Sequence, residues 1–334
     1  SRETSMSTTE PGQAAPAVAQ REDIIRAYEL VLGRAPDPNG LAYFISLAQS
    51  QQLNPNAIAK LLIASDEFKA SNGGLHDPVK VEMDGYCVFV RNSDRDIGGA
   101  IAKGIVYEPH VTALVDRELR MGDTFLDVGA NIGFFTMRAA SRVGASGKVI
   151  AVEPMDKNLQ LIYLGVRENN FENVVVWPFG ASDHDGLVSI VTDACTSNAL
   201  VQSAPSSRNV SIHAPVRTLD WMCQDLGRLD FIKIDIEGHE MFAWRGASRL
   251  LARFKPRIAT EFHPHAMKHN SGLDYREYLA FLFQYSPKIQ VLLAADNLVS
   301  CESQEAVMKE WEQSDTRHGG NGTSHLDLFL DPQM

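Results

Sequence analysis

Two hydrophobic patterns divide the chain. Between residues 21 and 71, apolar residues recur every three or four positions in successive stretches separated by turn residues, which predicts short helices. Asn54 and Ser65 stand where the N-caps of two of these helices are expected. We therefore expect a helical domain over residues 21–75. A disordered tail is expected over residues 1–20, of which the first five look like an expression-vector remnant.

From residue 79 to the end, short apolar runs alternate with helical stretches. Asp84-Gly85 predicts the turn of a hairpin, and residues 196–201 look like a loop. The runs that predict strands lie at 124–128, 148–152, 174–179, 231–236, 257–265, 288–293 and 325–330. The last two fit an antiparallel end of the sheet. The pattern predicts an α/β domain over residues 79–334, with a Rossmann-like sheet and helices on both faces.

The turn after the first strand of this sheet carries the first candidate site. It contains Asp127, Gly129, Asn131 and Gly133 at alternate positions, and the glycines let a ligand approach the backbone closely. The dinucleotide fingerprint requires a glycine where Asn131 stands, so a pyrophosphate is not favoured. Glu153 ends the second strand, where a carboxylate can accept both hydroxyls of a ribose. S-adenosylmethionine fits this pattern, and a glycine turn in an ordinary α/β protein is the alternative.

Two further segments are expected beside the same crevice. The third strand ends near Ala181, Ser182 and Asp183, which become candidates for contact with adenine. The alternative for them is a polar turn of structural importance only. Glu108 starts a helix that must pack beside the first strand, so its side chain either points toward the mouth of the sheet or pairs with the helix dipole.

Acidic residues end the fourth and fifth strands. Period 2 places Lys233 and Asp235 on one face of the fourth strand, where they form either an internal ion pair or part of the site. Glu237 follows Asp235, and the fifth strand ends in Glu261 and His263. Because the carboxyl ends of parallel strands meet at one edge of a sheet, these polar groups are expected to converge on one rim.

Composition narrows the classes of function. The chain has 334 residues, 44% of them hydrophobic, and a formal net charge of −11, which argues against a general nucleic-acid binder. Its four cysteines are far apart, so neither a zinc site nor a disulfide framework is indicated. No apolar run of about 18 residues and no signal peptide are visible, so we expect a cytoplasmic protein without a membrane span.

The motifs FLDVGANIGFFT, VIAVEP, FGASDHDG, RTLDWM, FIKIDIEGHE and RIATEFHP occur in this order. Together they resemble the FkbM family of S-adenosylmethionine-dependent methyltransferases. The resemblance implies a seven-stranded class I methyltransferase fold and O-methylation of a hydroxyl on a sugar, polyketide or similar molecule. The cofactor-binding residues that it implies, together with the candidates above, are Asp127, Gly129, Asn131, Gly133, Glu153, Pro154, Ser182, Asp183, Asp235 and Glu108. Glu240 lies on the family's acidic segment as well.

The segment from Arg21 to Ser71 resembles a small bacterial domain of unknown function that is often fused to glycosyltransferases and surface proteins. This resemblance implies association, so the helical domain is expected either to dock a partner protein or to pack as a structural extension. The same resemblance favours a sugar or glycan as the methyl acceptor, with a small natural product as the alternative. Homodimerisation is plausible, and nothing in the residues decides it.

Methyl transfer to a hydroxyl requires the acceptor oxygen in line, at about 3 Å from the methyl carbon. A base that takes the hydroxyl proton contributes roughly 10²–10⁴-fold, and the candidates are Asp235, Glu237, Glu261 and His263. His263 has the best intrinsic pKa, unless its ring is tied to the backbone. A divalent metal such as magnesium, held by Asp235 and Glu261, is the rival way to acidify the hydroxyl.

Two other classes of function stay open at this point. A nicotinamide-dependent oxidoreductase would need the glycine that Asn131 replaces. A non-catalytic scaffold would keep the fold and act through its helical domain, and loss of the loop glycines or of Glu153 would favour it. Both features are present in the sequence.

Overall fold

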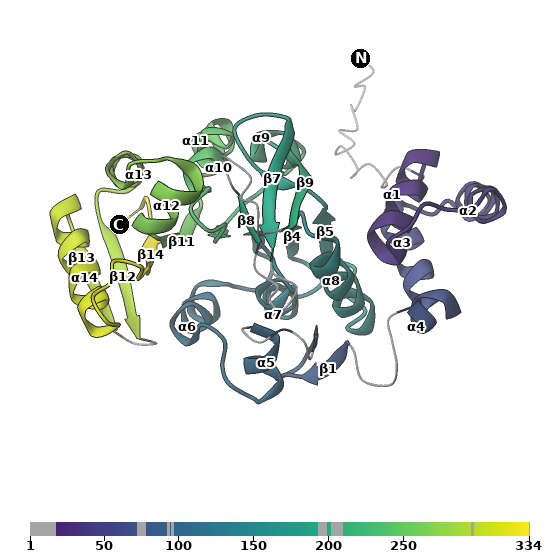
Figure 1. Ribbon diagram of the computed structural model, residues 1–334, viewed down its shortest axis with the longest axis horizontal. Helices are drawn as coiled ribbons and strands as arrows, with labels where there is room; N and C mark the ends of the chain where they lie inside the picture. Colours follow the sequence, from purple (N-terminus) through teal and green to yellow (C-terminus); the bar gives the residue numbers. More distant parts are fainter. Residues whose placement is uncertain are drawn as a thin grey trace, which may run out of the picture. The chain divides into compact units, whose positions relative to one another are not determined.

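The computed structural model describes residues 18–71, 78–91, 94, 97–192, 199–201, 210–294 and 297–333 (Figure 1). The chain divides into two compact units, Ser1–Phe68 and Lys69–Met334. Residues 1–17 of the predicted tail and residues 196–198 of the predicted loop lie outside the described residues.

The first unit is helical, as its apolar spacing predicts. Its helices are α1 (Arg21–Leu32), α2 (Pro38–Gln51), α3 (Pro55–Ala64) and the first residues of α4 (Asp66–Ser71). Ile24, Val31 and Ile58 are fully buried between them. Both predicted N-caps are confirmed, because Asn54 Oδ1 accepts the Ala57 N–H at 2.9 Å and Ser65 Oγ accepts the Phe68 N–H at 3.1 Å.

The second unit is organised around an eight-stranded sheet. Its strands are β3 (Thr124–Val128), β4 (Lys148–Val152), β5 (Val174–Trp177), β10 (Phe231–Ile234), β11 (Arg257–Phe262), β12 (Ile289–Ala294), β13 (Asn297–Cys301) and β14 (Leu326–Leu330). Their order is β13-β12-β14-β11-β10-β3-β4-β5. The strands from β11 to β5 are parallel, and β14 is antiparallel to β11 and β12, as expected. The seven expected strands are thus present, and β13 adds an eighth at the edge.

Helices cover both faces of this sheet (Figure 1). They are α5 (Ile97–Ala102), α6 (Pro109–Glu118), α7 (Phe134–Val143), α8 (Asp156–Glu168), α9 (Leu219–Met222), α10 (Glu240–Arg245), α11 (Ser248–Phe254), α12 (Pro264–Ser271), α13 (Tyr275–Tyr285) and α14 (Gln304–Arg317). On one face, Val128 and Ile232 share a core with Trp244 and Tyr278 of α10 and α13. A sheet buried on both faces explains why its strands are almost continuously apolar.

Two smaller sheets complete the unit. The predicted hairpin is confirmed, since β1 (Val79–Glu82) pairs with β2 (Cys87–Val90) in antiparallel fashion. The other sheet contains β6 (Gly180–Ala181), β7 (Gly186–Thr192), β8 (Ala199–Val201) and β9 (Val210–Arg217) in the order β6-β9-β7-β8. Residues 199–201 therefore form a strand, and the prediction of a loop there is wrong. Their place is fixed by pairing with β7, a long-range contact that local composition does not reveal.

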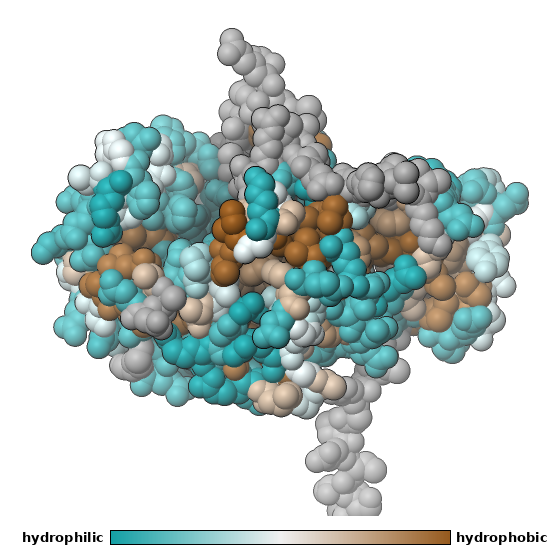
Figure 2. All heavy atoms as spheres, turned by 90° about the horizontal axis from the view of Figure 1, so that it is seen from below, coloured by the Kyte–Doolittle hydropathy of each residue, from teal (hydrophilic) through white to brown (hydrophobic). Residues whose placement is uncertain are grey.

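The surface mixes hydrophilic and apolar residues (Figure 2). Among the described residues, the large apolar side chains that are exposed are Tyr43, Leu61, Ile105, Val106, Met121 and Leu187. No helix in the described part of the chain is both long enough and apolar enough to cross a membrane.

Candidate functional site

A cavity of about 400 Å³ lies at the carboxyl ends of the parallel strands. Strands β4 and β5 follow β3 on one side, whereas β10 and β11 lie on its other side, so the order of the sheet reverses between β3 and β10. Gly129 follows β3, Asp235 follows β10, and both line the cavity. Open α/β sheets bind ligands at such a switch point. The topology therefore marks this cavity as the candidate site.

One side of the cavity, which we call the cofactor wall, consists of Gly129, Asn131 and Glu153. Gly129 has φ +79°, and a Cβ atom there would lie 2.0 Å from the carbonyl oxygen of Asp235. Only glycine fits at this point, because any side chain would collide with the neighbouring strand end. Asn131 also has positive φ, 51°, which is uncommon for a residue with a side chain.

Glu153 is held in place by the backbone. Its Oε2 accepts the Asn131 N–H at 2.8 Å, and its Oε1 accepts the Met155 N–H at 2.9 Å and the Asn158 side-chain amide at 3.3 Å. The side chain is 4% exposed, and this burial raises the pKa of the carboxyl to about 7 although the N–H donors favour the charged form. The structure thus places the predicted ribose acid at the cavity, in one fixed orientation.

Two predicted cofactor residues of the turn support the wall from behind. Asp127 and Gly133 do not line the cavity. Asp127 is 1% exposed, and its Oδ2 accepts the Thr136 hydroxyl at 2.6 Å. Gly133, with φ +85°, caps α7 and lies against Ile162. Both residues shape the turn from which the cofactor wall projects.

Ser182 and Asp183 lie outside the lining of the cavity, whereas Gly180 and Ala181 belong to it. Ser182 is fully buried, and its hydroxyl is 3.2 Å from Nε2 of His239. Asp183 is 2.7 Å from Nδ1 of His184. Of the predicted adenine segment, only Ala181 contributes to the cavity surface. Pro154, the last predicted cofactor residue, lines the cavity as well.

A second part of the cavity lining, which we call the acidic wall, carries Asp235, Glu237 and Glu261. Lys233 is 5% exposed, and its Nζ lies 3.3 Å from Asp235 Oδ2 and 4.8 Å from the ring centre of Phe135. The predicted internal ion pair is therefore present, and it also lines the cavity, so the two interpretations of this pair are compatible. Nearby carboxylates, with Asp235 first, raise the pKa of Lys233 against the effect of burial.

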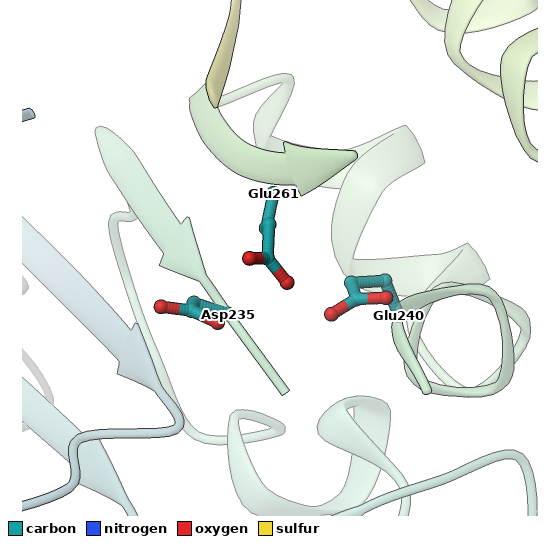
Figure 3. Close-up of side chains that lie close together, drawn as sticks. All are labelled: Asp235, Glu240 and Glu261. Atoms are coloured by element: carbon teal, nitrogen blue, oxygen red, sulfur yellow. The ribbon is translucent and has the colours of Figure 1, made fainter. Parts of the chain in front are cut away.

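Two residues of this wall converge with a third that lies behind it: Asp235 after β10, Glu261 on β11 and Glu240 on α10 point toward one another (Figure 3). We call this trio the acidic cluster; one carboxylate oxygen from each residue lies within 4.8 Å of the others. Glu240 Oε1 accepts the N–H groups of Ile236 and Gly238 at 3.0 and 3.2 Å. Burial raises the pKa of Glu240 to about 7 and that of Glu261 well above its ordinary value, and the neighbouring carboxylates add to both shifts.

Comparison with known proteins decides the class. The family model of the methyltransferase FkbM domain matches residues 127–286. Residues 127–286 thus match an FkbM methyltransferase domain. The match begins at Asp127 in β3 and includes both walls of the cavity, whereas Glu108 of the cavity lining precedes it. The second unit therefore contains an FkbM methyltransferase domain, and the α/β sheet described above carries it.

Solved structures of methyltransferases are distantly similar to the chain. A methyltransferase FkbM from Methylobacillus flagellatus KT is 18% identical, with a TM-score of 0.37; the match covers 83% of this chain and 57% of that protein. A precorrin-6y C5,15-methyltransferase from Geobacter metallireducens GS-15 is 12% identical (TM-score 0.36; 66% and 84% covered). A SAM-dependent methyltransferase from Aquifex aeolicus is 18% identical (TM-score 0.32; 55% and 81% covered). No curated protein matches the chain.

Within the FkbM domain, His263 stands apart from the other candidate bases because it does not line the cavity. It is the N-cap residue of α12, and its Nδ1 accepts the Ala266 N–H at 3.3 Å. Burial, with His325 and His265 nearby, lowers the pKa of the ring to about 4. The ring is thus neutral and tied to the backbone, which is the structural role that competes with catalysis.

Three further residues complete the site, and of these Phe135 and His325 were not predicted from the sequence. Tyr107, Phe135 and His325 line the cavity. The edge of the Tyr107 ring lies against Phe134, with ring centres 5.4 Å apart, and burial raises the pKa of the phenol well above its ordinary value. Phe135 lies in α7, Tyr107 precedes α6 and His325 precedes β14, so none of them stands at the carboxyl end of a parallel strand.

Backbone strain concentrates at this site. Six described residues other than glycine have positive φ, and three of them line the cavity, namely Glu108, Asn131 and Glu237. Glu108, at φ +40°, precedes α6, and burial raises the pKa of its carboxyl to about 7. Strained backbone of this kind costs about 1–3 kcal/mol per residue and persists mainly at functional sites. The strain makes Glu108 and Glu237 candidates for a functional role.

Proposed function

We propose that this chain transfers the methyl group of S-adenosylmethionine to a hydroxyl of a sugar or glycan. The observation that carries the proposal is the pairing of two walls across one cavity in an FkbM domain. The cofactor wall offers backbone and one fixed carboxylate, whereas the acidic wall offers several carboxylates. Carboxylates accept hydrogen bonds from hydroxyl groups, so the acidic wall suits an acceptor that carries more than one of them.

The cofactor wall fits the adenosine half of the methyl donor. Three donors orient Glu153 and use three of the roughly four acceptor sites of a carboxylate, so one site remains for a ribose hydroxyl. Ala181 supplies an apolar surface for an adenine ring, since it is buried and lines the cavity. S-adenosylmethionine, when bound, supplies an electrophilic methyl group, and the residues of the chain supply placement and proton transfer.

We assign the base to Glu237. Glu237 lines the cavity, and burial together with Asp235 and Glu240 raises the pKa of its carboxyl to about 8, so its ionised form is a stronger base than an ordinary carboxylate. Asp235 is engaged by Lys233, and His263 caps a helix away from the cavity. As the new bond forms, the acceptor proton passes to Glu237, which avoids an unstable oxonium product.

The choice of a sugar rests on the resemblance of residues 21–71 to a domain often fused to glycosyltransferases. A polyketide or peptide hydroxyl is the competing acceptor. Transfer of a radiolabelled methyl group to a panel of sugars, oligosaccharides, polyketides and peptides distinguishes them. Labelling confined to non-sugar acceptors would replace the proposed substrate class while leaving the reaction type intact.

The first test of the reaction type is calorimetric binding of S-adenosylhomocysteine. Micromolar binding to the wild type, lost in Glu153→Ala, is the expected result. A matched control is Glu277→Gln, which changes an exposed carboxylate on α13. Failure of the wild type to bind, or unchanged binding by Glu153→Ala, would contradict the assignment of this cavity to the methyl donor.

A further inference from the structure

We propose that Asp235, Glu240 and Glu261 bind one divalent cation of the magnesium or calcium type. The three residues come from different elements, and their carboxylates converge (Figure 3). The sequence places Asp235 and Glu261 at neighbouring strand ends, but the third ligand, Glu240, enters from the first turn of α10. Binding of the ion is independent of the proposed methyl transfer. Only the role of the ion in that reaction rests on the proposed function.

The spacing of the oxygens suits one hard cation. One oxygen of each carboxylate lies within 4.8 Å of the others. Magnesium and calcium bind oxygen at about 2.0–2.6 Å, so two oxygens on the same ion lie roughly 3–5 Å apart. The three carboxylates can therefore reach one ion with only small side-chain movements.

Unpartnered oxygens are the independent sign that a ligand belongs here. Glu240 is 0% exposed; its Oε1 accepts two backbone N–H groups, while its Oε2 has no hydrogen-bond partner. Glu261 is 7% exposed; its Oε1 lies 3.7 Å from His325 Nδ1, and its Oε2 has no partner either. A buried polar atom without a partner costs about 1–3 kcal/mol, more when it is charged. One cation between the two oxygens would satisfy both.

The charge balance points to a divalent ion. Three ionised carboxylates carry three negative charges, and Lys233, paired with Asp235, supplies one positive charge. A divalent cation would offset the remaining two negative charges, and Glu237 and Asp327, which also raise the pKa of Glu261, add further negative charge nearby. Protonation of the carboxyls is the competing way to relieve the repulsion, and the experiment below separates the two.

The position of the cluster gives the ion a use. Asp235 and Glu261 line the cavity, whereas Glu240 does not, so the ion would sit in the cavity wall with Glu240 behind it. Coordination positions that face the cavity would be open to an oxygen of the acceptor. On the proposed function, such an ion orients the acceptor and lowers the pKa of its hydroxyl.

The test measures ion binding to the full chain without methyl donor or acceptor. The protein is freed of metal with a chelator, and Mn²⁺ is titrated while the signal of free Mn²⁺ is followed by electron paramagnetic resonance. We expect one bound Mn²⁺ per chain, displaced by Mg²⁺ or Ca²⁺. Glu240→Gln and Glu261→Gln should each raise the Kd at least tenfold. Glu240→Gln retains an oxygen for the Ile236 and Gly238 N–H groups, so the turn should stay folded.

Glu277→Gln is the matched control, because it removes the same charge from an exposed position on α13. It should bind Mn²⁺ as the wild type does. As a second readout, Mg²⁺ or Ca²⁺ should raise the Tm of the wild type and of Glu277→Gln in a concentration-dependent way, and should not raise that of the two cluster variants.

The proposal would be overturned if the wild type did not bind Mn²⁺ and its Tm did not change with Mg²⁺ or Ca²⁺. Protonation of the carboxyls would then explain the unpartnered oxygens. Binding that survives both cluster substitutions would overturn the proposal as well, because the ion would then lie elsewhere. These outcomes are distinct from failure of the proposed function, which is measured by S-adenosylhomocysteine binding at the cofactor wall.

Discussion

On the cofactor wall, Glu153 is buried and accepts three hydrogen bonds. In the acidic cluster, Glu240 and Glu261 are buried as well, but each has one carboxylate oxygen without a hydrogen-bond partner. Both arrangements are built at the carboxyl ends of parallel strands. They differ in the source of their donors. The turns after β3 and β4 each aim one backbone N–H group at Glu153, whereas β10 and β11 bring several carboxylates together with one lysine.

This difference indicates a division of labour. The cofactor wall is complete before any ligand arrives, so it is suited to bind one donor molecule in one pose. The acidic wall has more carboxylates than cationic partners, so it is suited to bind a proton, a cation or the hydroxyl groups of an acceptor. Substitutions on the first wall should change affinity for the donor, and substitutions on the second should change the rate of transfer.

The largest expected effect is on the acidic wall. Glu237→Gln should lower kcat for methyl transfer by about 10²–10⁴-fold, because the acceptor hydroxyl loses its base. The affinity for S-adenosylhomocysteine should stay within about threefold of the wild type, since Glu237 is not on the cofactor wall. Steady-state kinetics with an acceptor from the panel, together with calorimetry, measure both quantities.

Asp183→Asn is a suitable control, because Asp183 is outside the lining of the cavity and pairs with His184. It should leave kcat within a few-fold of the wild type. If Glu237→Gln instead weakened donor binding and left kcat at saturation unchanged, the two walls would not divide the work as we propose.

The second effect concerns the point where the two walls touch. Gly129→Ala should lower the free energy of unfolding by about 3 kcal/mol or more, because its Cβ would collide with the Asp235 carbonyl. Gly122→Ala is the matched control: its φ is +84°, but the nearest atom is Ser146 Oγ at 3.6 Å. It should cost only about 1–2 kcal/mol, the price of the backbone conformation.

Denaturant unfolding followed by tryptophan fluorescence measures both variants. All four tryptophans lie at positions 177, 221, 244 and 311, so the signal reports the second unit alone. If the two substitutions lowered the free energy of unfolding equally, the close approach of Gly129 to the Asp235 carbonyl would not contribute to the cost.

The sequence predicted the cofactor wall better than the acidic wall, and the reason is physical. Gly129, Asn131 and Glu153 belong to one local βαβ unit, whose spacing is set by a tight turn and a short crossover. Every feature that positions Glu153 lies within a few residues of it or of that turn. Local sequence is therefore sufficient to predict this short-range geometry.

The acidic cluster depends on contacts between distant segments. Glu261 and Asp235 could be placed at neighbouring strand ends, but the strand ends at Phe262, one residue before His263, which becomes a helix cap. That single boundary moves His263 out of the lining of the cavity. The inward direction of Glu240 depends on the turn at Gly238, whose Cβ would collide with Ala266. In the small sheet of β6 to β9, the pairing of the strands was not predicted for the same reason, since it joins distant segments.

The third effect is a pH dependence of the cofactor wall. The pKa of Glu153 is raised to about 7 by burial, so its carboxyl is largely protonated below that pH in the free protein. Ribose hydroxyls donate to the charged form, and affinity for S-adenosylhomocysteine should therefore fall as the pH is lowered from 8 to 5. The expected loss is roughly 10- to 100-fold, measured by calorimetry across this range.

Glu153→Gln supplies the reference, because it cannot titrate and keeps one oxygen as an acceptor. Its weaker binding should vary less with pH than that of the wild type, and the ratio of the two removes the titration of the ligand. Asp127, the other acid that acts on Glu153, is common to both proteins. Parallel pH profiles for the two proteins would show that a different group controls donor binding.

The smallest expected effect is on stability and concerns Asp327, a carboxylate beside the acidic wall that pairs with a histidine. Asp327 stands opposite Glu261 in the β11–β14 pair, and its Oδ2 lies 2.5 Å from Nε2 of His110. Asp327 and Glu108 raise the pKa of His110 against the effect of burial. Because the folded state binds this proton more tightly, the stabilisation is complete below the ordinary histidine pKa of about 6.5 and is lost as the pH rises through the folded-state value.

His110→Asn should therefore destabilise the protein by about 1–2 kcal/mol at pH 5.5 and by clearly less at pH 9, in unfolding followed by tryptophan fluorescence. His213→Asn is the control, because His213 is exposed and lies next to Ser189 in the small sheet. It should cause only a small change that does not grow at low pH. A deficit of His110→Asn that is the same at both pH values would mean that packing of the ring, and not its charge, stabilises this edge of the acidic wall.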